Sequence, residues 1–367
     1  MPESPPDIDA ASGSHEPLAA DLAPMSSRCW RSGSFGWRLR RLIAIAAFGL
    51  MITAAVFWGV APVLASRSTS VQMVAWVPEW SLVVTIAVLG AVAALCWDSR
   101  RGRLWGILLA GVVLIGPVFG VSSREFRWWA SPHPGEFRVV FLNAQDPSKA
   151  AARTLWEVIE PLHADLLVCA NPGFIAPEWR SLPGPTSTYG AGAIKWLSPF
   201  LVAARQGAIS LRTMSRKNRV RAVAVSFEIT CASSGGSRQH HLAAIDLPSD
   251  WELDRHVIMS QLVDAIADYT GGDRSNEFEL ILGDFNSTPR APSRARLEPH
   301  YQDAFERVGS GWGATWPRRY PMLRIDAVFA RTQGGLRVTS VRTFDPMQGG
   351  HRGLIVDLVE AQPSISN

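Results

Sequence analysis

A carboxylate and a carboxamide stand two residues apart in the segment LILGDFNSTP, residues 280–289, directly after an apolar run. While the chain remains extended, the side chains of Asp284 and Asn286 project to the same side and can reach one point at a strand end. There Asp284 can orient or deprotonate a water, and the amide N–H groups of Asn286 can hold a developing phosphoryl charge. Taken alone, the segment is equally compatible with a strand followed by an ordinary Asp/Asn turn.

The region around this segment alternates between strand and helix signals. Apolar strands are expected over 137–143, ending in Asn143, and over 165–171, ending in Asn171. Other segments with clear periodicity are helices over 149–163 and 254–269, a hairpin of 221–230 with 241–246, and strands over 324–330, 336–343 and 353–359. This mixture predicts α/β layers with mixed sheets, and residues 136–362 are ample for one core.

Three long apolar runs precede that region, at residues 42–65, 81–97 and 104–121. Each approaches the roughly 20 residues that a helix needs to cross a bilayer, and tryptophans stand near several of their ends, as is typical of membrane interfaces. Buried core helices of a soluble protein are the alternative. Three charge-free runs so close together favour three transmembrane helices, which would occupy residues 42–121.

The distribution of cations predicts the orientation in the membrane. Five arginines precede the first run and three lie between the second and third, whereas the loop over 66–79 holds only Arg67. Residues 1–41 are therefore expected to be a cytoplasmic tail, disordered by composition, and a linker over 122–135 leads to a domain outside. The strong preference for arginine over lysine indicates a GC-rich, bacterial genome, which places the protein in a bacterial cell membrane.

The formal net charge of +4 says little about binding partners, because much of the excess comes from the arginines beside the membrane runs. The outer domain is nearly neutral, which argues mildly against a general nucleic-acid binder. One basic cluster could contact a phosphate-bearing ligand or an anionic membrane, although such a run is more often a solvated loop. It consists of Arg212, Arg216, Lys217, Arg219 and Arg221.

The four cysteines leave one question open. Cys29 would be cytoplasmic and Cys96 would lie in a membrane helix, whereas Cys169 and Cys231 would face an oxidising compartment. A Cys169–Cys231 disulfide and two free thiols are both compatible with the sequence. No cysteine or histidine spacing typical of a zinc site is present.

Several further motifs follow in order, and together they carry a family resemblance. They are Asp303-Ala304-Phe305, the run GWGATWP over 311–317, Arg324-Ile325-Asp326, and Gly350-His351-Arg352 before an apolar strand. With Asn143 and Gly283-Asp284-Phe285-Asn286, they make residues 137–360 resemble the endonuclease/exonuclease/phosphatase family. The resemblance implies a four-layer α/β sandwich of two packed mixed sheets flanked by helices, and cleavage of phosphate esters with Mg²⁺ or Mn²⁺. Members with three N-terminal membrane helices look like the nearest relatives.

The resemblance also implies roles for individual residues. Asp284 would activate the attacking water, and Asn286 would hold a phosphate oxygen. His351, oriented by Asp326, would stabilise the phosphoryl group or assist the leaving oxygen. Asn143 would hold a neighbouring carboxylate or lie at the edge of the metal site. Each of these residues also has an ordinary structural explanation, such as an ion pair or a strand-end turn.

The chain departs from the family pattern where the family binds its metal. Asn171 stands in place of the glutamate that is the main ligand, Gly350 in place of an acidic residue, and Asp246 in place of a histidine that contacts phosphate. Since Mg²⁺ binds through carboxylates and other hard oxygens, these losses weaken the site. Asp246 could instead be a relocated ligand, making a site with Asp284, Asn143 and Asn171.

Two functional hypotheses remain from the sequence. The chain is either a membrane-anchored extracytoplasmic phosphoesterase with a partly altered active site, or a catalytically inactive relative that binds a ligand or protein at the envelope. A phosphodiester or phosphomonoester would be the substrate of the former, whether lipid, nucleic acid or small molecule. A transporter or channel is disfavoured because the apolar runs carry no charged residue to mark a pathway.

Overall fold

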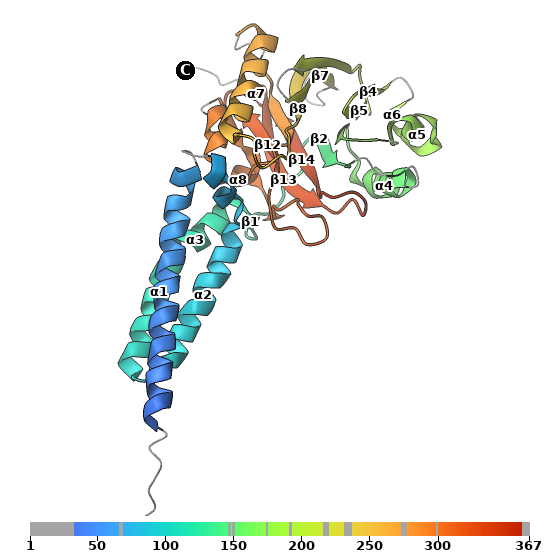
Figure 1. Cartoon of the computed structure of the whole chain (residues 1–367). Coiled ribbons are helices and arrows are strands. Elements are labelled where there is room, and N and C mark those ends of the chain that lie inside the picture. The colour runs from blue at the N-terminus through green and yellow to red at the C-terminus, as the bar shows by residue number, and fades with distance from the viewer. Residues whose placement is uncertain are drawn as a thin grey trace, which may run out of the picture.

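The computed structural model describes residues 33–65, 69–145, 148, 151–173, 175–190, 193–215, 220–230, 237–272, 277–298 and 300–361. Residues 1–32 of the expected tail, residues 216–219 of the basic cluster, and Cys231 lie outside the described residues. The chain forms an elongated bundle of helices attached to one side of an α/β domain (Figure 1). Because Cys231 is not described, the choice between a Cys169–Cys231 disulfide and two free thiols is not tested, and Cys169 is fully buried.

The bundle consists of α1 (Gly33–Ala65), α2 (Glu79–Cys96) and α3 (Arg100–Arg124). All three are long and apolar enough to cross a membrane, so they are candidate membrane spans. The first begins at Gly33, so the prediction of a disordered tail as far as residue 41 is wrong for residues 33–41, where the helix extends beyond the apolar run. The helices pack through Met51, Ile86 and Ala110, while most large apolar side chains on the outside of the bundle remain exposed.

A short 3-10 helix, η1 (Thr69–Trp76), connects α1 to α2 at the end of the bundle next to the domain. At the same end of the bundle, α3 leads into β1 (Phe126–Arg127), which pairs with β11 (Gly311–Trp312) of the domain (Figure 1). The expected linker over 122–135 is thus partly held by strand pairing. The bundle meets the domain at more than one place.

The domain contains two six-stranded sheets among the described residues. The first has the spatial order β13 (Leu336–Phe344), β14 (Gly353–Glu360), β2 (Phe137–Asn143), β3 (Leu166–Ala170), β5 (Phe200–Ala204), β4 (Ile194–Leu197). The second has the order β10 (Tyr301–Asp303), β12 (Asp326–Arg331), β9 (Leu280–Asp284), β8 (Ser237–Asp246), β7 (Arg221–Thr230), β6 (Ser210–Ser215). The pairs β2–β3 and β8–β9 are parallel and the others antiparallel, so both sheets are mixed, as predicted.

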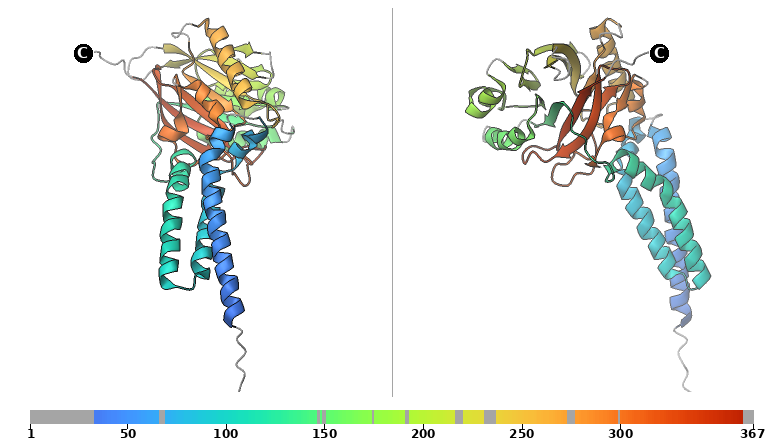
Figure 2. Two further views of the ribbon diagram at one scale, coloured as in Figure 1. Left: turned by 60° about the vertical axis from the view of Figure 1, so that its left-hand side comes forward. Right: turned by 180° about the vertical axis from the view of Figure 1, so that it is seen from behind.

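Successive side chains of each strand point to opposite faces of its sheet, and this alternation determines which residues pack in each layer. On β2, Val139 and Phe141 face the core between the two sheets, whereas Val140 and Leu142 face helices on the outside. The outer face of the first sheet is covered by α4 (Ala151–Ile159), η2 (Glu160–Leu162), α5 (Ile175–Ser181) and α6 (Pro183–Tyr189). The second sheet is covered by α7 (Arg255–Thr270) and η5 (Pro292–Leu297), and α8 (Ala304–Val308) packs at the inner core. The four-layer sandwich is confirmed, and Figure 2 shows it from two further sides.

One edge of the sandwich collects the polar strand ends. Both parallel pairs finish there, with Asn143 beside Ala170 and Asp246 beside Asp284 in the registers. A Cβ atom at Gly283 would lie 2.0 Å from the carbonyl oxygen of Ile245, so glycine lets β8 and β9 approach at this edge. The candidate site forms here.

Candidate active site

Asp284 occupies the end of β9 and is 2% exposed. Its Oδ2 accepts a hydrogen bond from Asn143 Nδ2 at 3.0 Å, and its Oδ1 accepts one from the backbone N–H of Asn286 at 2.8 Å. Burial, and then the negative charge of Asp326, raise the pKa of Asp284 well above its ordinary value. The carboxyl group is therefore held in one orientation by groups that the sequence analysis had selected.

His351 and Asp326 form a buried pair beside Asp284. His351 Nδ1 lies 2.8 Å from Asp326 Oδ2, and His351 Nε2 lies 3.8 Å from Asp284 Oδ2. Burial by itself would lower the pKa of His351, but the charge and hydrogen bond of Asp326, helped by Asp284, raise it to about 9. The imidazole is therefore a cation at neutral pH, enclosed between two carboxyl groups.

Gln145 completes the surroundings of the imidazole. Its side-chain amide nitrogen lies 2.9 Å from His351 Nε2. A protonated ring donates at this atom, so the amide must be turned to present its oxygen. A Cβ at Gly350 would lie 1.7 Å from the terminal amide group of Gln145, so the acidic residue that the family carries at this position would compete with Gln145 for the same space.

Asn171 joins the ends of three strands. Its Nδ2 donates to Asn143 Oδ1 at 3.1 Å and to Asp246 Oδ2 at 3.2 Å, from a left-handed backbone with φ of 48°. Arg221 Nη1 donates to the same oxygen of Asp246 at 3.3 Å. Burial raises the pKa of Asp246, against the lowering effect of its hydrogen bond with Asn171 and the charge of Arg221. Asn143, Asn171 and Asp246 thus meet, linked by N–H donors.

Asn286 holds the turn after β9. Its Nδ2 donates to the carbonyl of Leu247 at 2.7 Å, and its φ of 45° lies in the left-handed region that asparagine tolerates. One of its two amide hydrogens is therefore committed to the loop after β8. The residue still lines the cavity with Asp284 and His351.

These groups surround a cavity of about 870 Å³. Asn143, Gln145, Asn171, Asp246 and Asp284 are among its lining residues. The sequence analysis did not select several other lining residues, among them Trp76, Arg221 and Trp316. Arg221 was considered only as part of a basic cluster and Trp76 only as an interfacial residue, whereas Trp316 lies within a motif that had been singled out.

The sequence profile of the Endonuclease/Exonuclease/phosphatase family matches residues 98–348. The chain belongs to this family. Members of the family are hydrolases that act on phosphoester bonds. No match is found among the curated proteins.

Three solved structures are similar to part of this chain. A functionally unknown conserved protein from Enterococcus faecalis V583 is 11% identical with a TM-score of 0.45, covering 61% of this chain and 100% of its own. The catalytic domain of human Nocturnin with a bound sulfate anion is 17% identical with a TM-score of 0.44, covering 63% and 96%. An endonuclease/exonuclease/phosphatase family protein from Bacteroides thetaiotaomicron is 11% identical with a TM-score of 0.43, covering 63% and 100%.

Because the endonuclease/exonuclease/phosphatase family is generally metal-dependent, the site was tested for its fit to a divalent cation. The group Asn143, Asn171 and Asp246 does not fit, because it offers one carboxylate whose Oδ2 accepts from two N–H donors. The group Asp284, Asp326 and His351 fits better, because its candidate ligand atoms all lie within 4.8 Å of one another. Its two carboxylates are the ligands, since a protonated His351 offers no lone pair. In addition, Asp326 Oδ1 is buried and has no hydrogen-bond partner among the described residues.

Proposed function

We propose that this protein is a membrane-anchored extracytoplasmic hydrolase of a phosphodiester or phosphomonoester, with a partly altered active site. The observation that carries the proposal is the 3.8 Å approach of His351 Nε2 to Asp284 Oδ2 inside the cavity. The two groups are a buried base and a buried acid, side by side, in a chain of the endonuclease/exonuclease/phosphatase family. Such a pair provides both proton transfers that hydrolysis needs.

In this mechanism Asp284 accepts a proton from water, and its raised pKa makes it a stronger base near neutral pH. The oxygen of that water forms a bond to phosphorus, and the bond from phosphorus to the leaving oxygen breaks. His351, kept charged by Asp326, donates a proton to the leaving oxygen. Arg221, which lines the same cavity, adds a second positive charge for the phosphoryl oxygens, and Asn286 has one amide hydrogen left for them.

A divalent cation, Mg²⁺ or Mn²⁺, would be held by Asp284 and Asp326 with His351 beside them. When bound, such an ion supplies positive charge that stabilises the phosphoryl group and lowers the pKa of bound water. Asn143 keeps the Asp284 carboxylate in position. Asp246 keeps its hydrogen bonds with Asn171 and Arg221 and does not bind the ion in this proposal.

The three candidate spans provide the anchor, and the lipid bilayer is the first partner. Two arginines precede α1, three lie near its start, and three lie in the first turn of α3. Together they support a cytoplasmic N-terminus, which puts the domain outside a bacterial cell membrane. The near-neutral domain gives no strong support to a nucleic-acid substrate.

The full chain, purified in detergent, tests this proposal with p-nitrophenyl phosphate and bis(p-nitrophenyl) phosphate as probes, with Mg²⁺, Mn²⁺ or a chelator. We expect turnover that falls at least about 100-fold in Asp284→Asn and in His351→Asn. Asp268→Asn, an exposed aspartate on α7, is the matched control and keeps wild-type turnover. Absence of turnover by the wild-type chain under every condition would overturn the proposal.

A second function, ligand binding without turnover, is favoured by the hydrogen bonds of Asn171. At the position of the family's main metal ligand, its N–H groups satisfy Asn143 and Asp246 without a cation. Calorimetric titration with inorganic phosphate separates the two functions. Binding of phosphate by a chain that turns over neither ester supports the binding module.

A further inference from the structure

The segment between the first two candidate spans is built into the α/β domain. Gln72 of η1 donates from Nε2 to the carbonyls of Trp251 at 2.7 Å and Leu253 at 2.6 Å. Its Oε1 accepts from the backbone N–H of Arg255 at 3.1 Å, and the residue is only 6% exposed. Three hydrogen bonds thus fix η1 to the loop that follows β8, the strand that ends in Asp246.

Trp76, at the end of the same segment, lines the cavity that holds Asp284 and His351. The guanidinium of Arg255 lies over its ring, 5.6 Å from the ring centroid. The Arg255 side chain is held in turn by the carbonyls of Pro248 and Asp250. One wall of the cleft is therefore supplied by the connection between two membrane helices.

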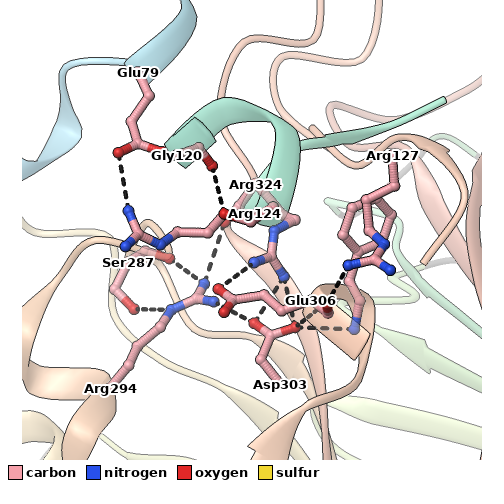
Figure 3. Close-up of polar contacts among 11 residues, drawn as sticks. Glu79, Gly120, Arg124, Arg127, Ser287, Arg294, Asp303, Glu306 and Arg324 are labelled. Atoms are coloured by element: carbon pink, nitrogen blue, oxygen red, sulfur yellow. Dashed lines mark hydrogen bonds and ion pairs between the residues drawn. The ribbon is translucent and has the colours of Figure 1, made fainter. Parts of the chain in front are cut away.

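A buried carboxylate in the first turn of α2 makes a second connection to the site. Glu79 is 1% exposed, and its Oε1 lies 3.1 Å from Arg290 Nε and 3.0 Å from Arg124 Nη1. Arg290 belongs to the loop after β9, a few residues beyond Asp284. In the same loop Arg294 donates to Ser287, as Figure 3 shows for the polar groups at this junction. The loops after β8 and β9 are both tied to the bundle.

The other side of the cleft also meets the bundle. Trp80 Nε1, near the start of α2, donates to the carbonyl of Met322 at 3.4 Å. The loop that contains Met322 also contributes Trp316 to the cavity wall, and Arg318 bonds this loop to Asp345 and Gly349. In Figures 1 and 2 the loop between β13 and β14 lies on the side of the domain from which the bundle projects.

Three loops that contribute lining residues to the cleft also carry five large apolar side chains that are exposed to solvent, here named the rim, and Trp316 among them lines the cleft itself. Their exposed fractions are 59% for Trp251, 36% for Trp316, 78% for Tyr320, 39% for Met322 and 57% for Met347. Aromatic and methionine side chains grouped beside the end of a candidate span are suited to the interfacial zone of a bilayer.

We infer that the substrate is a phosphoester carried by a membrane lipid, whose head group enters the cleft while its acyl chains remain in the bilayer. The inference rests on the proposed hydrolase function. Trp76 and the rim place the mouth of the cleft beside the outer end of the bundle, within reach of a head group. The leaving oxygen or the retained phosphate then belongs to the lipid, which approaches by diffusion within the membrane.

Full-length protein reconstituted in vesicles of phosphatidylethanolamine, phosphatidylglycerol and phosphatidic acid provides the test. These lipids offer both phosphodiesters and a phosphomonoester, and mass spectrometry measures the lipid and water-soluble products. Bis(p-nitrophenyl) phosphate and p-nitrophenyl phosphate are supplied to the same vesicles. We expect cleavage of a vesicle lipid that disappears in Asp284→Asn.

Rim variants make the test specific. The double variant Tyr320→Ser with Met322→Ser is expected to lower the ratio of lipid to soluble turnover about tenfold, whereas Trp196→Ser, an exposed tryptophan on β4, leaves the ratio unchanged. If a soluble ester is hydrolysed while the vesicle lipids remain uncleaved, the lipid inference is overturned and the proposed hydrolase function stands. Absence of turnover of any probe overturns both. A ratio equal in rim and control variants also overturns the inference.

Discussion

His351 Nδ1 and Asp326 Oδ2 lie 2.8 Å apart, and both side chains are almost completely removed from solvent. A hydrogen bond in such surroundings is strong only if the ring is charged, because Asp326 must otherwise keep an uncompensated buried charge. Asp284 lies on the other side of the ring, 3.8 Å from Nε2, and adds to the effect of Asp326 on the pKa of His351. The protonation state of His351 therefore determines whether the buried negative charge of Asp326 is compensated.

The pH dependence of stability follows from this pair. The pKa of His351 rises from about 6.5 to about 9 on folding, so its stabilisation is complete below about pH 6.5 and is lost as the pH rises through about 9. The difference corresponds to on the order of 3 kcal/mol. Melting temperatures measured with a chelator across this range should fall with rising pH. Asp326→Asn should flatten the profile, whereas His133→Asn, an exposed histidine, should not. An unchanged profile in Asp326→Asn would contradict this account.

Asn171→Glu should restore affinity for Mg²⁺. The new carboxylate would replace an amide that lies between Asn143 and Asp246, and it adds a full negative charge where hard oxygen ligands are needed. A ligand that binds the folded state raises stability by RT ln(1 + [L]/Kd), so the melting temperature should rise more steeply with Mg²⁺ than in wild type. Asn171→Gln retains the amide and serves as the control. Equal metal responses of the two variants would exclude a metal site at this position.

Glu79→Gln should loosen the loop after β9. The substitution leaves the charges of Arg290 and Arg124 without their partner, and loss of one member of a buried ion pair costs about 3 kcal/mol. Hydrogen exchange should show faster amide exchange over 286–297 in the full chain. Asp98→Asn, at an exposed aspartate between α2 and α3, should leave exchange in that segment as it is in wild type.

Gly283→Ala should disrupt the edge at which the site forms. A Cβ there meets the carbonyl oxygen of Ile245 at 2.0 Å, so β8 and β9 must separate. Overpacking of this kind costs typically 1–3 kcal/mol, and it displaces Asp246 relative to Asp284. Chemical denaturation should show the loss of stability. Gly271→Ala, with open space around its Cβ but a φ of +64°, controls for the removal of a glycine as such.

Much of the fold was predictable because its signals are local. Apolar alternation on β2, the helix period of α7 and the charge-free runs of α1 to α3 each act over a few turns or residues. The motif around Asp284 and the motif around His351 are likewise continuous in sequence. The family resemblance carried by these motifs implied the four-layer sandwich, which the structure confirms. In the structure the side chains of Asp284, Asp326 and His351 lie together, with ligand atoms within 4.8 Å of one another.

The tertiary structure decided what surrounds these residues. Arg221 reaches Asp246 because the start of β7 pairs with the end of β8, and Gln145 reaches His351 across a separation of 206 positions. Trp76 enters the cleft only because Gln72 anchors η1 to a loop far along the chain. Neither a periodicity nor a motif carries such information, since these contacts depend on the packing of distant elements and on which hydrogen-bond donors that packing leaves facing each acceptor.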